Sequence, residues 1–250
     1  MSKNILLGVQ LWSLRSEFQK NPEEAFRKVK GLGYDYVETA GNYGWSVEKW
    51  KEMLAETGLK VIGAHLGAAD DLFKRLETEI PFQTAIGNHN YGVPSMPAEK
   101  QNAEGFKATA ATLNKIADKL KSSGGVVYYH NHAFEFEKHG GKTGYEILIE
   151  ETDPSKVFFQ VDTFWVERMK YKAVPTLTKY ASRILMVHAK EIVLETNKDT
   201  TIGKGDIDFP GVVSLAKAKK WPLIVEYEGE NPLPVVKESA AYLSKLISEK

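Results

Sequence analysis

The chain has 250 residues, with 33 basic and 33 acidic side chains and no cysteine. This composition excludes a disulfide scaffold, a thiolate metal site and a cysteine nucleophile, and zero net charge gives no general attraction to nucleic acid or anionic lipid. No apolar run approaches the roughly 20 residues that a membrane-spanning helix needs. The first apolar stretch is too short for a signal peptide, so we expect a cytoplasmic protein, or a periplasmic one if a leader has been removed.

Short runs rich in Val, Ile and Tyr alternate with amphipathic segments along the chain. The runs are bounded by Gly, Pro, Asn or Asp and predict buried strands at 6–11, 34–39, 60–65, 90–93, 126–131, 157–161, 184–189 and 223–228. Capping residues, first-turn prolines and terminal glycines between them predict helices at 21–31, 47–57, 103–121, 143–152 and 232–248.

Eight strands over this length leave about 31 residues for each repeat, which is the size of a strand–helix unit. Strands that alternate with helices form parallel sheets, and eight such units typically close into a barrel. An open, doubly wound sheet is the alternative, but no Gly-x-Gly-x-x-Gly turn follows the first strand. We therefore predict a single (β/α)8 TIM barrel that forms one domain over residues 1–250.

Polar side chains follow nearly every predicted strand, at the end of the barrel where the loops converge. They are Gln10, Trp12, Glu38, His65, Ser95, His130, Asn131, His132, Glu135, Asp162, His188, Lys190, Glu226 and Glu228. Buried charges need a compensating partner, and carboxylates with an imidazole suit Mn²⁺, Mg²⁺, Co²⁺ or Zn²⁺. Structural alternatives remain: a hydrogen-bonded pair for Asp162 and His188, core packing for Trp12 and Trp165, and a link between strand ends for Glu38.

The order of these motifs resembles the xylose-isomerase-like barrels, specifically the sugar phosphate isomerase/epimerase family. The resemblance covers most of the chain and rests on GVQLWSLR (8–15), YVE (36–38), AH (64–65), YHNHAFEF (129–136), VDTFW (161–165), VHAKE (187–191), IGKGDIDF (202–209) and IVEYE (224–228). It implies one divalent metal ion (Mn, Co, Mg or Zn) held by a glutamate, an aspartate, a histidine and a second glutamate.

Three of these ligands map onto their motifs directly, as Asp162, His188 and Glu226. Many relatives carry the remaining glutamate early on the fifth strand, where this chain has Tyr129-His130. We therefore assign Glu135 as the fifth-strand ligand, with His132 as the substitute. Strand alternation places His130 and His132 on the same side of that strand.

The resemblance implies isomerisation or epimerisation of a sugar through an enediolate, with Glu135 and Glu226 as the acid and base. The residues expected to contact substrate are Trp12, Glu38, His65, His130, His132, Trp165, Lys190 and Glu228. Arg15 and Arg168 are the only arginines expected near the strand ends, so an unphosphorylated sugar is at least as plausible as a sugar phosphate.

Three other functions remain open. A metal-dependent lyase or dehydratase on a keto-sugar, cyclitol or glycoside would use the same metal and base. An apurinic endonuclease would need more histidines and basic loops than this neutral chain supplies, and a sugar-binding barrel without activity would lack the metal. We expect a small-molecule sugar as the partner, with no nucleic acid and no membrane; a homodimer is one option for the oligomeric state.

Overall fold

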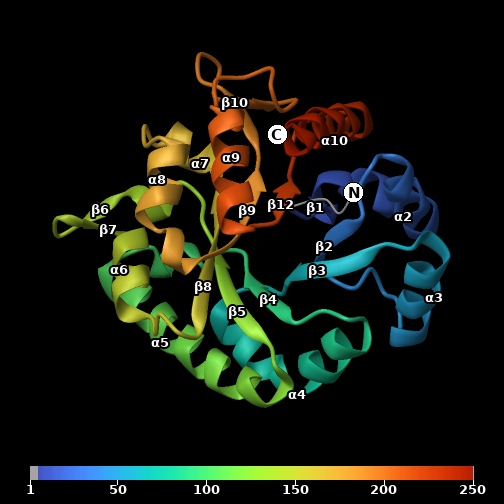
Figure 1. Ribbon diagram of the computed structural model, residues 1–250. Coiled ribbons are helices and arrows are strands. Elements are labelled where there is room, and N and C mark those ends of the chain that lie inside the picture. Colours follow the sequence, from blue (N-terminus) through green and yellow to red (C-terminus); the bar gives the residue numbers. More distant parts are fainter. Residues whose placement is uncertain (1–4, 250) are drawn as a thin grey trace.

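The computed structural model describes residues 5–249, in which eight parallel strands close into a barrel (Figure 1). The strands follow one another in the order β1-β12-β9-β8-β5-β4-β3-β2. Their bounds are β1 (Leu7–Gln10), β2 (Tyr36–Ala40), β3 (Lys60–His65), β4 (Asn90–Val93), β5 (Val126–His130), β8 (Val157–Asp162), β9 (Ile184–Ala189) and β12 (Leu223–Val225). The predicted (β/α)8 barrel is confirmed.

The last strand differs most from its predicted bounds, because it ends at Val225 rather than at residue 228. Beyond Glu226 the backbone leaves the barrel wall and bonds to side chains. The amide of Tyr227 donates to Ser13 Oγ at 2.9 Å, and that of Glu228 donates to Asp199 Oδ2 at 2.6 Å.

An outer layer of helices covers the barrel (Figure 1). It consists of α2 (Pro22–Gly31), α3 (Val47–Thr57), α4 (Ala69–Ala85), α5 (Ala103–Leu120), α6 (Gly144–Glu151), α8 (Ala173–Lys179), α9 (Phe209–Lys219) and α10 (Pro232–Ser248), with the short helices α1 (Arg15–Lys20) and α7 (Thr163–Arg168). The side chains of Asn21, Ser46 and Thr143 cap α2, α3 and α6.

Alternation along the strands divides the barrel interior into an apolar layer and a polar layer. Ile62, Tyr128, Met186 and Ile224 form a buried cluster in the apolar layer. Two residues further along β5 and β9 lie His130 and His188, which therefore point to the same side as Tyr128 and Met186. The polar layer lies at the carboxyl ends of the strands.

Glycine makes room for the largest of these interior side chains. A Cβ atom on Gly92 would lie 2.5 Å from the Tyr128 ring, and one on Gly63 would lie 2.8 Å from the Tyr128 hydroxyl. Real Cβ atoms do not approach so closely. Glycine on β3 and β4 thus leaves space for the Tyr128 side chain to reach Glu38 on β2 inside the barrel.

Two hairpins extend from the barrel. The first, β6 (Lys138–His139) with β7 (Lys142–Thr143), follows β5; the second, β10 (Glu191–Val193) with β11 (Lys198–Thr200), follows β9. The buried carboxylate of Glu191 accepts the backbone N–H groups of Ile192, Gly203 and Ile207, at 3.0–3.1 Å. Glu191 therefore holds the segment between β9 and α9, which includes the β10–β11 hairpin, against the barrel.

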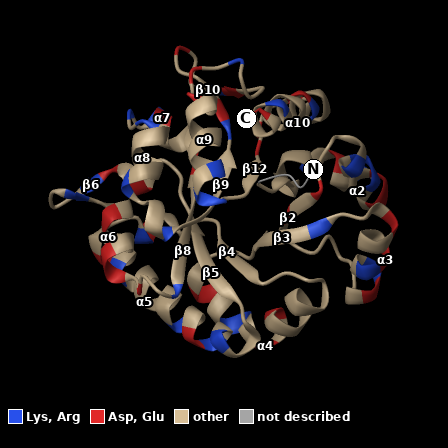
Figure 2. Cartoon of the chain, in the orientation of Figure 1, with Lys and Arg blue, Asp and Glu red and all other residues tan. Residues whose placement is uncertain are grey.

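The outer surface carries acidic and basic side chains interspersed around the helices (Figure 2). Within residues 5–249, no helix is both long enough and apolar enough to cross a bilayer.

Candidate metal centre and substrate cavity

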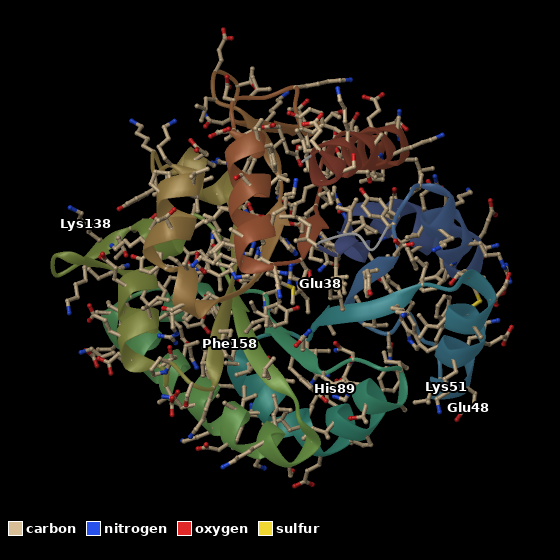
Figure 3. The ribbon with its side chains drawn as sticks, in the orientation of Figure 1. Glu38, Glu48, Lys51, His89, Lys138 and Phe158 are labelled. Carbon is tan, nitrogen blue, oxygen red and sulfur yellow. The ribbon has the colours of Figure 1, made fainter. Side chains whose placement is uncertain are left out.

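Glu38 is fully buried near the centre of the ring of strands, in the polar layer (Figure 3). Its carboxylate lies within hydrogen-bond distance of four interior side chains. Gln10 Nε2 is 2.7 Å away, Gln160 Nε2 2.8 Å and His188 Nε2 2.6 Å, and the Tyr128 hydroxyl is the fourth partner. Glu38 thus joins β1, β5, β8 and β9 at one point.

The charge on Glu38 determines which imidazole nitrogens remain for other partners. Burial raises the pKa of Glu38, but the imidazoles of His65 and His188 outweigh this and lower it to about 2. A carboxylate only accepts hydrogen bonds, so His188 donates from Nε2 and Gln160 turns its amide nitrogen toward Glu38. Gln160 Oε1 then faces His130 Nδ1 and His65 Nε2, each at 3.0 Å, and accepts from both. This leaves His188 Nδ1 and His130 Nε2 for other partners.

His130, Asp162, His188 and Glu226 form a buried cluster whose ligand atoms all lie within 4.8 Å of one another. They stand at the ends of β5, β8, β9 and β12. His188 Nδ1 is 3.2 Å from Glu226 Oε2 and 3.8 Å from Asp162 Oδ2. Two imidazoles and two carboxylates suit a divalent transition metal. Glu38 behind His188 is the kind of hydrogen-bond partner that metal-binding histidines use to fix their orientation.

Asp162 provides an independent test of this assignment. Its Oδ1 accepts the backbone N–H of Trp165 at 3.2 Å and so caps α7, whereas Oδ2 is buried with no hydrogen-bond partner. The Asn131 side chain accepts the Asp162 amide at 3.1 Å and so holds the backbone at this strand end. Unpaired buried polar atoms are costly. The donor set therefore fits a cation that satisfies Asp162 Oδ2.

The protonation states of Glu226 and His130 also fit metal binding. Burial raises the pKa of Glu226, but the Lys190 ammonium and the His188 imidazole outweigh it, so this pKa lies well below the usual carboxyl range. Burial raises the pKa of Asp162. Burial and the neighbouring histidines lower the pKa of His130, which keeps this imidazole neutral. Neutral imidazole and ionised carboxylate are the forms that bind metal.

Lys190 is a buried cation beside the cluster. Its Nζ lies 3.6 Å from Glu226 Oε2, pairs with the Glu228 carboxylate, and lies 5.0 and 5.1 Å from the ring centroids of Phe164 and Trp165. Burial lowers the pKa of Lys190, but the surrounding carboxylates outweigh it and raise it above the usual lysine range. Lys190 therefore stays charged and presents a fixed positive charge next to Glu226.

Glu135, the fifth-strand ligand expected from the sequence, lies outside the cluster. It belongs to a 3₁₀ turn, Phe134–Phe136, and its carboxylate accepts the Tyr129 hydroxyl and the His132 amide, both at 2.7 Å. Tyr129 alternates with His130 and points to the outer face of β5. Glu135 is therefore held behind the strand, and His130 occupies the position in the cluster.

A cavity of about 420 Å³ opens onto the cluster. Its lining consists of Trp12, Ala40, His65, Pro94, Ser95, His130, His132, Glu226 and Glu228. Most residues expected to contact substrate thus meet at one cavity. Trp165 stands beside it, because its ring lies 5.3 Å from that of His132 and its Nε1 is buried without a partner. Trp12 is 47% exposed, so it does not serve as a core residue.

Gln160 and Tyr128 also belong to this site, but the strand-end pattern does not indicate them, because both lie inside apolar strands. Alternation is the signal that indicates them. Gln160 stands two residues before Asp162 on β8, and Tyr128 stands two residues before His130 on β5. Each therefore points into the barrel with the ligand that follows it.

The family model described as a xylose isomerase-like TIM barrel matches residues 26–246. A sugar phosphate isomerase/epimerase from Parabacteroides distasonis shares the fold, with a TM-score of 0.84, 24% identity, and coverage of 96% of this chain and 97% of that one. An L-ribulose 3-epimerase shares it with a TM-score of 0.74 and 16% identity, covering 97% of this chain and 94% of that one.

Among curated proteins, the inosose dehydratase of Clostridium tetani is 29% identical over 167 residues, which is 57% of this chain. The match spans only 55% of the length of that dehydratase.

Proposed function

The chain belongs to the xylose isomerase-like TIM barrel family, and from this premise we propose that it is a divalent-metal-dependent enzyme acting on a sugar or a related polyol. It would move a proton next to a carbonyl group and release an isomer or epimer. The buried cluster of His130, Asp162, His188 and Glu226, with its unpartnered Asp162 oxygen, carries this proposal. Its similarity to an epimerase and to sugar phosphate isomerase/epimerases supports the same class of reaction.

A divalent cation in the cluster would polarise the carbonyl and hydroxyl oxygens of the substrate and offset negative charge that develops on them. The protein side chains would supply the remaining functions. Glu226 is ionised and lines the cavity, so it is our candidate for the group that accepts the proton. The Lys190 ammonium, next to Glu226, would bind a substrate oxygen.

The unpartnered polar atoms around the cavity favour a substrate with many hydroxyl groups. His132 Nδ1 and Trp165 Nε1 are buried without partners in the described part of the chain. Each gains a hydrogen bond from a hydroxyl group placed beside it. This arrangement supports a polyhydroxylated ligand better than an apolar one.

A second candidate reaction is β-elimination from a keto-sugar or cyclitol, in which a base removes a proton and a hydroxyl or alkoxyl group leaves. The position of Glu135 favours this candidate. Epimerisation by two carboxylates needs an acid or base on each face of the carbon, yet Glu135 is engaged by Tyr129 and the His132 amide. Two carboxylates line the cavity, Glu226 and Glu228, and Glu228 is paired with Lys190. The inosose dehydratase similarity supports the same candidate.

Mass spectrometry of reactions in D2O distinguishes the two candidates. Purified protein loaded with Mn²⁺, Co²⁺ or Zn²⁺ is incubated with a panel of keto-sugars and inososes. Isomerisation or epimerisation should give a product that has lost no group and carries one deuterium on carbon. Elimination should give a product that has lost water or an alcohol.

Glu226→Gln provides the matched control, because it keeps the size of the side chain but removes its basicity. It should abolish both kinds of product while the fold remains intact. If no deuterium enters any substrate and no product forms with any of the three metals, the proposed proton transfer is wrong.

A further inference from the structure

Trp12 is the most exposed large hydrophobic side chain among residues 5–249, at 47%. Single exposed hydrophobic residues are common on protein surfaces and need no explanation by themselves. The position of Trp12 is what distinguishes it, because it lines the cavity that also contains His130 and Glu226. Those two residues are 2% and 7% exposed. The cavity therefore runs from a buried inner end at the cluster to an exposed outer end at Trp12.

The backbone of Trp12 is fixed by the same network that organises the cluster. Gln10 Oε1 accepts the Trp12 amide at 3.0 Å, and Gln10 Nε2 donates to Glu38 at 2.7 Å. Trp12 is the second residue of a 3₁₀ turn, Leu11–Leu14, which follows β1 directly and has Gln10 as its capping residue. The indole is thus carried by a rigid element and tied to the barrel interior.

Arg15 supports one side of the indole. Its guanidinium lies 5.2 Å from the centre of the Trp12 ring and donates to the Trp12 carbonyl at 3.0 Å. It also donates to the Glu228 carbonyl at 2.8 Å. The two terminal nitrogens of Arg15 are therefore committed to backbone carbonyls, which favours a supporting role over binding of a phosphate group. A side chain held in this way loses little conformational freedom when a ligand stacks on it.

We infer that Trp12, supported by Arg15, forms an outer subsite that stacks against a second ring of the substrate. This inference rests on the proposed function, because it places the reacting sugar at the metal-binding cluster and the second ring at the cavity entrance. The substrate class is then a glycoside, in which a sugar carries another pyranose or an aromatic ring. Aromatic faces pack well against the C–H face of a sugar ring and against other aromatic rings.

Binding measurements on matched pairs of glycosides test the subsite without any turnover. The metal-loaded protein is titrated calorimetrically with methyl and phenyl β-D-glucopyranoside, and with the corresponding galactopyranosides and xylopyranosides. Each pair shares its sugar and differs only in the second ring. We expect wild type to bind the phenyl member roughly three- to tenfold more tightly, in keeping with one stacking contact.

Trp12→Ala should bring the phenyl-to-methyl affinity ratio close to one. Leu6→Ala is the matched control: Leu6 is also exposed, at 37%, but it precedes β1 and lies outside this cavity. This control should keep the wild-type ratio. A wild-type ratio near one, an unchanged ratio in Trp12→Ala, or no binding of any pair overturns the subsite.

Two further outcomes separate this inference from its alternatives. If the D2O reactions succeed on monosaccharides but the wild-type ratio is one, the proposed function stands and the subsite fails. If sedimentation shows that wild type is a dimer and Trp12→Ala is a monomer, Trp12 belongs to an interface between copies of this chain, and the subsite is again overturned.

Discussion

Glu38 is a buried carboxylate whose role is to orient other side chains. It binds His188 directly, and it acts on His130 through Gln160. Neither imidazole can rotate without breaking a hydrogen bond, and both imidazoles are buried. The lone pairs that face the cluster are therefore fixed by a residue that does not itself belong to the cluster.

Glu38→Gln tests this role. The variant loses the charge that holds the His188 Nε2 proton, so we expect the Mn²⁺ dissociation constant to rise roughly 10- to 100-fold, as for other partners of metal-binding histidines. Isothermal titration measures it. Tyr128→Phe is the control, because it removes one donor to Glu38 but leaves the His188 contact; it should change the constant much less. Equal effects of the two variants would contradict the orienting role.

Metal uptake should release a proton from His188. Burial lowers the pKa of His188, but Glu38 and Glu226 outweigh this and raise it well above the usual range. Without metal, the imidazole is thus protonated at neutral pH, and a cation must displace the Nδ1 proton. We expect release of about one proton per ion and an affinity that increases with pH. Titrations in buffers of different ionisation enthalpy measure this release; identical heats in all buffers would exclude it.

Glu135 should make the folded state less stable as pH rises, which is opposite to the effect of a carboxyl group whose pKa is lowered by folding. Burial raises its pKa from 4.5 to about 8, against the opposing hydrogen bonds of Tyr129 and two backbone amides. Between these values the folded state keeps a proton that the unfolded state loses, so this group contributes less stability as pH rises.

Glu135→Gln removes this titration. Relative to wild type, its free energy of unfolding should rise between pH 4.5 and 8, by up to about 1.4 kcal/mol per pH unit. Urea unfolding at several pH values measures the difference. Parallel stability curves for the two proteins would mean that the Glu135 pKa is the same in the folded and unfolded states.

At the scale of elements, the conformation of the segment between β9 and α9 depends on one side chain. Glu191 accepts three backbone N–H groups, and the hairpin it supports brings Asp199 to the Glu228 amide. Glu228 in turn pairs with Lys190. The motifs at 187–191 and 202–209, which are separate in the sequence, are therefore parts of one structural unit beside the cavity.

Glu191→Ala should loosen this unit. Losing the acceptor of three N–H groups should lower the free energy of unfolding by about 2–4 kcal/mol and expose residues 191–207 to protease. Limited proteolysis with mass spectrometry locates the cuts. Asp206→Ala is the control, since this exposed carboxylate accepts only the Leu194 amide in the described structure. If both variants are cut at the same rate, Glu191 does not hold the segment between β9 and α9 in place.

The sequence predicted the strands better than the helices, for a physical reason. Strands of a closed barrel are buried on both faces and appear as apolar runs, and 60–65, 90–93 and 184–189 have the predicted bounds. Helix prediction relied on caps. The long helix α4 has no side-chain cap at Ala68 and contains Pro81, and no helix was predicted there.

At the scale of the whole molecule, the alternation of strands with helices and the chain length were enough to predict the barrel and the end of it at which the site lies. They did not indicate which fifth-strand residue joins the buried cluster. That choice depends on whether the chain after His130 returns to the cavity or folds behind the strand, which is decided by the contact between Glu135 and Tyr129. A contact between an outward side chain and a turn leaves no periodic signal in a sequence.

We expect His130, Asp162, His188 and Glu226 to hold a divalent metal without Glu135. Metal analysis after saturation with Mn²⁺ and removal of free ions tests it most directly. We predict about one ion per chain in wild type and Glu135→Gln, and loss of the ion in Asp162→Asn and His130→Ala. Loss in Glu135→Gln with full occupancy in His130→Ala would contradict this assignment.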